Sequence, residues 1–257
     1  MSRPQPSLTI DVDVTNPGQF FACCGLLELA HRLLQGDAIE GWFDEGMFCI
    51  AAAGSGPDAF YRVFEGLLST QIEEINARGD RTTHPVRLAA FGITLDWWID
   101  DRGEKTPFKL WAGQQTSLRI VNDLRDALHG LPEVKPKNLF DAGRALTGRF
   151  GVDPRAAWNA LDVGFSPNEQ EMEVETFPAA ELLAAVGLQR FRPLQDVQER
   201  RAGFRYATSS IPLPPSIARA ACTGLLTVGV VKTYRFRLSE RGSYKGFDFA
   251  TSIGGDS

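Results

Sequence analysis

The chain has 257 residues, of which 43% are hydrophobic and 23% charged, and its formal net charge is −5 at neutral pH. These values are close to the globular average and allow one large domain or two small ones with a sizeable core. No stretch approaches the roughly 18 uninterrupted apolar residues of a membrane span, and the start lacks the apolar region of a signal peptide, so we expect a cytoplasmic protein without membrane contact.

The first hundred residues alternate between strand and helix patterns. Strict alternation of apolar and polar residues predicts a strand at Leu8–Val14, and the turn Thr15–Gly18, whose Thr or Asn can cap a helix, precedes an apolar-rich helix at Gln19–Gly36. Next we expect two short strands around a turn at Asp44–Gly46, a helix at Ala59–Ala77 and a strand at Val86–Asp100. This β-α-β-β-α-β order is that of ferredoxin-like folds.

Residues 106–257 show a less regular α+β pattern. We predict an amphipathic helix at Ser117–Leu131 with Ser117 as a candidate N-cap, a helix beginning at Pro178, and a C-terminal hairpin at Val228–Ser252 that turns at Glu240–Ser243. The stretch Leu139–Gln170 is rich in Gly, Arg and Asp without periodicity, which indicates an ordered loop region of the kind that is often functional. We therefore predict a ferredoxin-like, RAMP-like unit at 1–105 and a mixed, loop-rich basic part at 106–257, packed together as one body.

Cysteines and histidines give little sign of a metal site or a cofactor. Each of the four cysteines stands in an apolar context typical of free buried thiols, at Cys23, Cys24, Cys49 and Cys222. The three histidines are dispersed, and none has a cysteine or histidine at ligand spacing. His31 and His84 are the candidate acid–base groups of a metal-independent ribonuclease, although either can equally have a structural role.

Basic residues concentrate near the C-terminus. The segment Arg190–Lys245 holds eleven basic and three acidic residues, a local charge of +8, which indicates either a surface for phosphate or a solvated basic face. In the predicted hairpin, period two puts Tyr234 and Phe236 on one face and the arginines between and after them on the other. The candidate nucleic-acid-binding residues of this part are Arg192, Arg201, Arg205, Arg235, Arg237, Arg241, Tyr244 and Lys245.

The stretch "TPFKLWAGQQTS", Thr106–Ser117, combines side chains suited to nucleic acid. Lys109 can neutralise a phosphate, Trp111 can stack on a base, and the amides of Gln114 and Gln115 can bind bases or sugars. The alternative interpretation is that Trp111 anchors the loop in the core.

Several longer motifs resemble a known family. They are "TNPGQFFACCGLLELA" at Thr15–Ala30, "FKLWAG" at Phe108–Gly113, "GRFGVDPRAAWNALDVGFSPNEQ" at Gly148–Gln170, "ELLAAVGLQRFRP" at Glu181–Pro193, and the tail motifs Tyr234–Arg237 and Arg241–Tyr244. Together they are similar to a subunit family of type I-U CRISPR systems, also called type I-G, which has been labelled a small Cas-eight-like subunit or Csb-three.

The resemblance implies a non-catalytic subunit of the Cascade interference complex in antiviral defence. Its implied partners are other Cascade subunits, a CRISPR guide RNA and target double-stranded DNA. The resemblance also implies a role in recognition of the PAM. Arg144 and Arg149, in the Gly- and Arg-rich region, join the candidate nucleic-acid-binding residues. Two alternatives stay open: a RAMP-type endoribonuclease that matures guide RNA through His31 or His84, and an assembly subunit that binds only protein.

Overall fold

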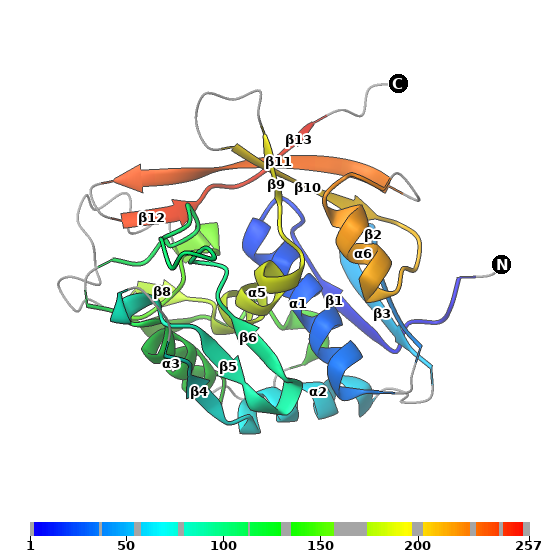
Figure 1. The fold of residues 1–257 in the computed structure, drawn as a ribbon. Coiled ribbons are helices and arrows are strands. Elements are labelled where there is room, and N and C mark those ends of the chain that lie inside the picture. The colour runs from blue at the N-terminus through cyan, green and yellow to red at the C-terminus, as the bar shows by residue number, and fades with distance from the viewer. Residues whose placement is uncertain are drawn as a thin grey trace.

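Figure 1 shows the computed structural model of the chain, which describes residues 3–35, 38–53, 58–76, 80–112, 114–129, 135–156, 174–196, 203–226, 230–241 and 244–253. The side chains of residues 230, 231, 241 and 244 lie outside this description. The fold is mixed α+β, with small antiparallel sheets and helices packed between them. In the described part of the chain, no helix is both long enough and apolar enough to cross a membrane.

The N-terminal elements form a three-stranded sheet with one long helix. The elements are β1 (Leu8–Asp11), α1 (Pro17–Leu33), β2 (Ile39–Asp44) and β3 (Met47–Ala52), and the sheet order is β1-β3-β2. Asn16 caps α1 by accepting a hydrogen bond from the Gln19 amide at 3.2 Å, as the turn pattern predicted. Glu45 and Gly46 join β2 to β3 with φ angles of 42° and 83°, which a hairpin turn of this kind requires.

The ferredoxin-like unit is not confirmed, because the later strands form a sheet of their own. This second sheet has the order β4-β5-β6, and its elements follow the helix α2 (Ala59–Ser69) as β4 (Ile72–Glu74), β5 (Val86–Leu88) and β6 (Ile93–Leu95). The predicted helix to Ala77 is therefore too long, since Thr70 is already extended with ψ 136°. The predicted strand Val86–Asp100 divides where Gly92 adopts φ 57°, and its two parts pair with each other.

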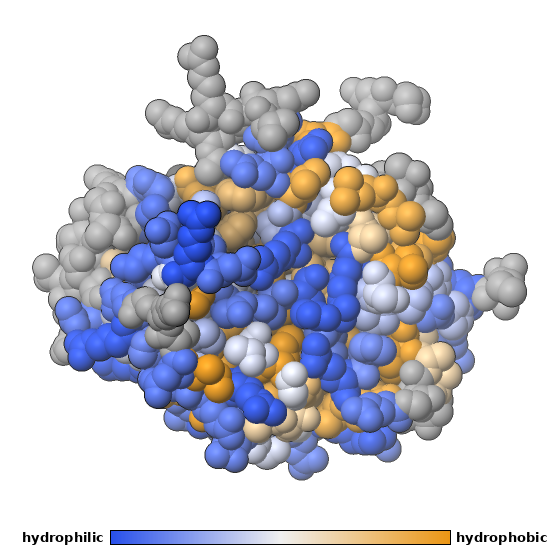
Figure 2. Space-filling model, viewed as in Figure 1, coloured by the Kyte–Doolittle hydropathy of each residue, from blue (hydrophilic) through white to orange (hydrophobic). Residues whose placement is uncertain are grey.

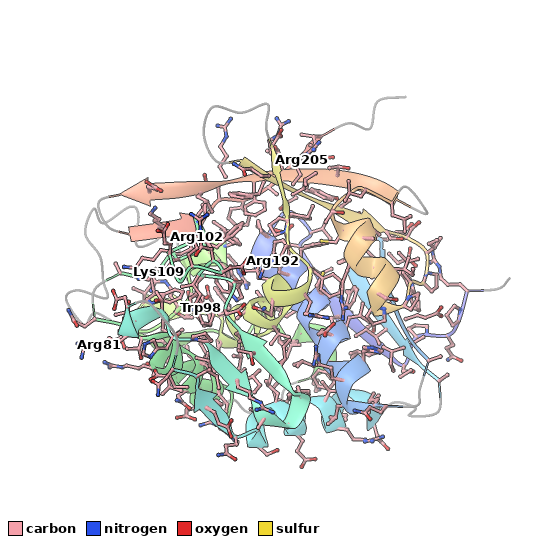
Figure 3. The ribbon with its side chains drawn as sticks, in the orientation of Figure 1. Arg81, Trp98, Arg102, Lys109, Arg192 and Arg205 are labelled. Atoms are coloured by element: carbon pink, nitrogen blue, oxygen red, sulfur yellow. The ribbon has the colours of Figure 1, made fainter. Side chains whose placement is uncertain are left out.

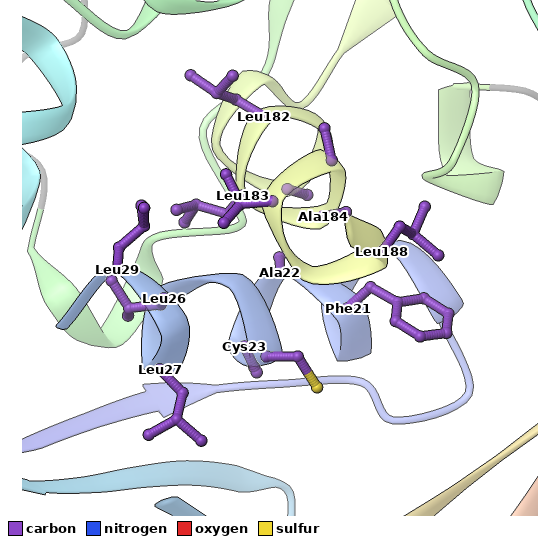
Figure 4. Packing of buried hydrophobic residues seen from close by; sticks show 14 of the residues in the cluster. Phe21, Ala22, Cys23, Leu26, Leu27, Leu29, Leu182, Leu183, Ala184 and Leu188 are labelled. Atoms are coloured by element: carbon purple, nitrogen blue, oxygen red, sulfur yellow. The ribbon is translucent and has the colours of Figure 1, made fainter. Parts of the chain in front are cut away.

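The core is organised by two apolar helices that cross in close contact, α1 and α5 (Pro178–Arg190) (Figure 4). Both helices are buried on nearly all sides. Gly25 and Gly187 face each other's backbones: a Cβ on Gly25 would lie 1.9 Å from the Leu183 carbonyl oxygen, and one on Gly187 1.9 Å from that of Phe21. The main core contains residues from Leu8 to Ala250, on both sides of residue 105. The predicted boundary between the parts 1–105 and 106–257 stays a prediction.

A five-stranded antiparallel sheet covers the top of the molecule in the view of Figure 1. Its order is β12-β11-β10-β9, with β13 beside β11; the strands are β9 (Leu194–Asp196), β10 (Gly203–Ser209), β11 (Val230–Arg241), β12 (Tyr244–Phe247) and β13 (Thr251–Ile253). The predicted hairpin is confirmed, and Tyr234 and Phe236 are buried as period two required. The remaining elements are α3 (Ser117–His129), α6 (Pro215–Cys222), β7 (Arg144–Leu146), β8 (Val174–Thr176) and 3-10 turns at Arg81–Thr83, Ala89–Phe91 and Pro136–Asn138.

The four cysteines are free and buried, which confirms the prediction of structural thiols. Burial raises the pKa of the Cys23 and Cys24 thiols well above the usual value, so these groups stay protonated and unreactive. Among the described residues, no group of three or more His, Cys, Asp or Glu side chains could hold a metal ion.

Candidate nucleic-acid interface

Trp111 is the centre of an aromatic cluster in the core. Its ring lies 5.3 Å from that of Trp98 and 5.5 Å from that of Phe150, both edge to face, and Trp97 packs on the same cluster. Such pairs stabilise a core beyond the area they bury. The side chain is only 2% exposed, so Trp111 anchors its loop, and its ring is not open to stacking on a base.

The indole groups of this cluster also hold a neighbouring segment in place. Trp98 Nε1 donates to the Thr83 carbonyl at 2.8 Å, and Trp111 Nε1 donates to the Thr82 carbonyl at 3.2 Å. A short antiparallel bridge between Ile99 and Lys105 then turns the chain back toward residues 80–83. Residues 80–83 and 105–112 are thereby brought side by side on a rigid aromatic floor.

These two segments and β12 form the walls of an open groove of about 590 Å³. It is lined by Asp80, Thr82, Lys105, Thr106, Pro107, Lys109, Trp111, Ala112 and Lys245. Three of the chain's six lysines therefore line one groove, together with a single carboxylate. Lys109 lies just below the C-terminal sheet in Figure 3, on a face where hydrophilic residues predominate in Figure 2.

The lysines of the groove have only weak ionic partners. Lys105 Nζ lies 3.3 Å from Asp80 Oδ2, and Lys245 Nζ lies 2.8 Å from Glu240 Oε1. Pairs between partly exposed groups of this kind contribute about 0–1 kcal/mol. An anion of higher charge can therefore recruit both ammonium groups at little cost.

Lys109 is the most perturbed charge in the groove. Its ammonium group donates to the Trp111 carbonyl oxygen and lies 4.7 Å from the centre of the Trp111 ring. Burial lowers the pKa of Lys109 to about 8, the nearby charge of Lys105 acts in the same direction, and Asp80 opposes it. A partly buried cation beside a second cation favours the approach of an anion.

The two glutamines of the predicted stretch differ in their exposure to solvent. Gln114 is exposed, and its Oε1 accepts a hydrogen bond from Arg81 Nη2 at 2.9 Å, which extends the polar surface beyond the groove. Gln115 is only 6% exposed, and its Oε1 points toward Gly148, where an added Cβ would lie 3.2 Å away. The prediction that Gln115 contacts a base is wrong, because the chain turns inward there to begin α3.

The prediction for Arg149 is also wrong, since this side chain is 1% exposed. Arg149 precedes a loop whose four successive backbone N–H groups, from residues 150 to 153, donate to the buried Glu181 carboxylate at 2.9 to 3.1 Å. Burial raises the pKa of the Glu181 carboxyl group to about 7, and the positive charge of Arg149 opposes this shift. Arg149 therefore belongs to the interior, whereas Arg144 is half-buried on β7, apart from the groove lining.

The arginines of the C-terminal sheet lie on a different surface from the groove. Arg205 and Arg235 are directly opposite each other on β10 and β11, and Arg237 follows two residues later on the same outer face of the C-terminal sheet. Arg235 Nε lies 2.6 Å from Asp196 Oδ2, which partly neutralises this face. Arg201 lies outside the described residues, and so do the side chains of Arg241 and Tyr244. Arg192 is 63% exposed and lies beside the groove rather than on the sheet.

The two candidate histidines lie on separate elements. His31 is exposed on α1, while His84 Nδ1 lies 3.2 Å from Glu74 Oε1, a partner that sequence spacing could not name. Sequence reasoning also missed Lys105, which stands in an acid-rich stretch with no distinguishing signal.

No protein-family model, curated protein or solved structure matches the chain.

Proposed function

We propose that the chain is a non-catalytic nucleic-acid-binding subunit of a type I CRISPR interference complex, and that the lysine groove holds a sugar–phosphate backbone. The observation that carries the binding proposal is the convergence of Lys105, Lys109 and Lys245 on one groove with a single carboxylate in its lining. The choice of the complex rests on the resemblance of the sequence motifs. Guide RNA and target DNA are the ligands that this choice implies.

The chemistry of the groove suits a phosphate backbone in three respects. Lysines supply the charge that dominates nucleic-acid affinity and releases counterions from the phosphates. Thr82 and the Arg81–Gln114 pair add hydrogen-bonding groups at the side of the groove. The groove is open, so a strand can lie along it without a change in the fold. The net charge of −5 does not oppose this, because local charge determines where a phosphate binds.

Removing the three groove lysines is expected to weaken nucleic-acid binding and its salt dependence. In the variant Lys105→Ala/Lys109→Ala/Lys245→Ala, we expect the slope of log K against log salt to become shallower by about 2 to 3, since each lost phosphate contact contributes about 0.7–0.9. The measurement is fluorescence anisotropy of labelled RNA and DNA over a salt series. The matched control replaces the chain's other three lysines, Lys135, Lys137 and Lys232, and changes the net charge equally. Equal losses in both variants would assign the effect to overall charge and reject the groove.

Binding is also expected to weaken as pH rises above about 8, the pKa to which burial lowers Lys109. A bound phosphate favours the charged ammonium group and raises its pKa, so above pH 8 binding takes up a proton. Linkage for one proton limits the effect to a tenfold loss of affinity per pH unit. The variant Lys109→Arg keeps its charge at these pH values, so its affinity should change less between pH 7 and 9 than that of the wild type. An identical pH profile for both proteins would show that Lys109 does not contact the ligand.

A further inference from the structure

A second pocket adjoins the lysine groove across a narrow ridge. It has a volume of about 270 Å³ and is lined by Trp97, Thr106, Pro107, Phe108, Leu188, Arg192, Pro193, Gln195 and Phe204. Thr106 and Pro107 line both the pocket and the groove, so they form the ridge between them. Phe108 lines the pocket and the next residue, Lys109, lines the groove.

The pocket has aromatic walls and a polar rim. Phe108 is half-buried and supplies the accessible ring, which lies 4.5 Å from the ring of Phe204 at a tilt of 46°. Phe204 and Trp97 are buried and support Phe108 from behind as part of the lining. Arg192 is 63% exposed, with Asp96 4.0 Å away as an ionic partner, and Gln195 is exposed beside it. The volume is just below the range of about 300–1,000 Å³ for small-molecule sites, which suits a single flat ring system rather than a larger ligand.

We propose that this pocket receives one unstacked nucleobase of a single strand whose phosphates lie in the lysine groove. The proposal rests on the proposed function and specifies its ligand. A strand that crosses the Thr106–Pro107 ridge places its backbone on Lys109 and a base against Phe108, since adjacent residues face the two sides. Arg192 can cover the base face or bind its edge, and Gln195 can donate to or accept from that edge.

The charge around the pocket favours a base over an apolar side chain of a partner protein. The pocket adjoins a groove with three lysines, and its own rim carries the guanidinium of Arg192, so a polyanion is attracted to both. Bases in a duplex are stacked and paired, whereas single-strand readers commonly place bases on aromatic side chains beside a basic groove. The two cavities together therefore fit single-stranded nucleic acid.

The test compares two single strands that carry the same phosphates. One is an oligothymidylate of about 12 nucleotides and the other an abasic strand of the same length, within the site sizes of single-strand binders. Full-length wild-type protein should bind the oligothymidylate about tenfold more tightly, which corresponds to the ~1–3 kcal/mol of one base on aromatic groups. Gln195→Trp, which blocks the pocket mouth, and Arg192→Ala should each reduce this preference toward unity. Arg119→Ala, an exposed arginine on α3, is the matched control and should preserve it.

The outcomes separate the pocket from the groove. The variant without the three groove lysines should bind both strands more weakly and keep the preference for the strand with bases. If the wild type binds both strands equally and with a steep salt dependence, the pocket proposal is overturned while the proposed function stands. A preference that survives both Gln195→Trp and Arg192→Ala likewise overturns it, because the base is then bound elsewhere. Absence of binding to either strand overturns both proposals.

Discussion

The variant Gly187→Ala is expected to lose about 3 kcal/mol or more of its free energy of unfolding. A Cβ at this position would lie 1.9 Å from the Phe21 carbonyl oxygen, a backbone atom that cannot move aside without shifting α1. The two helices would have to separate along their whole contact, which lies at the centre of the core (Figure 4). Urea denaturation followed by tryptophan fluorescence measures the loss as a lower midpoint.

Gly66→Ala is the matched control for this prediction. Gly66 is also in a helix, α2, but an added Cβ there would meet the ends of two side chains, Leu33 at 3.1 Å and Phe91 at 3.4 Å. Only the contact with Leu33 is tight, and that side chain can rotate. Alanine is also the better helix former by about 0.8–1.0 kcal/mol. We therefore expect a change within about 1 kcal/mol of wild-type stability for Gly66→Ala. Equal stability of the two variants would contradict the close crossing of α1 and α5.

The variant Glu181→Gln is expected to lose about 3–5 kcal/mol, the usual effect of breaking a buried charged network. Each oxygen of the Glu181 carboxylate accepts two backbone N–H groups of residues 150–153. An amide replaces one oxygen with a donor, which leaves two buried N–H groups without an acceptor and facing another N–H. The measurement is made at pH 8, above the pKa of about 7 to which burial raises this carboxyl group, so that the comparison is with the ionised form.

Glu175→Gln on β8 is the control, since Glu175 is exposed and its replacement should leave stability nearly unchanged. The Glu181 loop also supports the groove: it places Phe150 against Trp111, and Gly151 accepts a hydrogen bond from the Phe247 amide of β12 at 3.1 Å. Weaker nucleic-acid binding is therefore expected in Glu181→Gln even where the variant stays folded. Wild-type stability in this variant would show that the carboxylate does not organise the loop.

Three of the motifs that carry the family resemblance meet in the core, whereas a fourth, at Phe108–Gly113, contributes Lys109, Trp111 and Ala112 to the groove. Asn16 Nδ2 donates to Asp153 Oδ1 at 3.0 Å, joining the first motif to the Gly- and Arg-rich one. Gly25 and Gly187 join the first motif to the α5 motif, and Glu181 joins α5 to the loop at 150–153. Packing and buried hydrogen bonds thus explain the residue types of these three motifs, which describe how the chain folds more directly than what it binds.

Local pattern was sufficient wherever an element depends on its own residues. The cap at Asn16, the proline at the start of α5 and the alternation of Tyr234 and Phe236 with arginines predicted their elements, because capping, backbone restriction and strand periodicity act over a few residues. The burial of the cysteines followed from apolar context in the same way. Sequence order could not decide which strands pair. The strands expected in one ferredoxin-like sheet form two separate sheets in the structure.

The sequence by itself determined the α+β class, most of the helices and the hairpin, and it singled out the stretch around Lys109. Only the tertiary structure decided which of the candidate side chains reach a common surface. Gln114 and Gln115 are neighbours in sequence, yet one is exposed and the other buried; Lys105 and Lys245 are far apart in sequence, yet both line the groove. The physical reason is that exposure and proximity depend on how distant segments pack, here on the aromatic cluster around Trp111, and no local pattern records that packing.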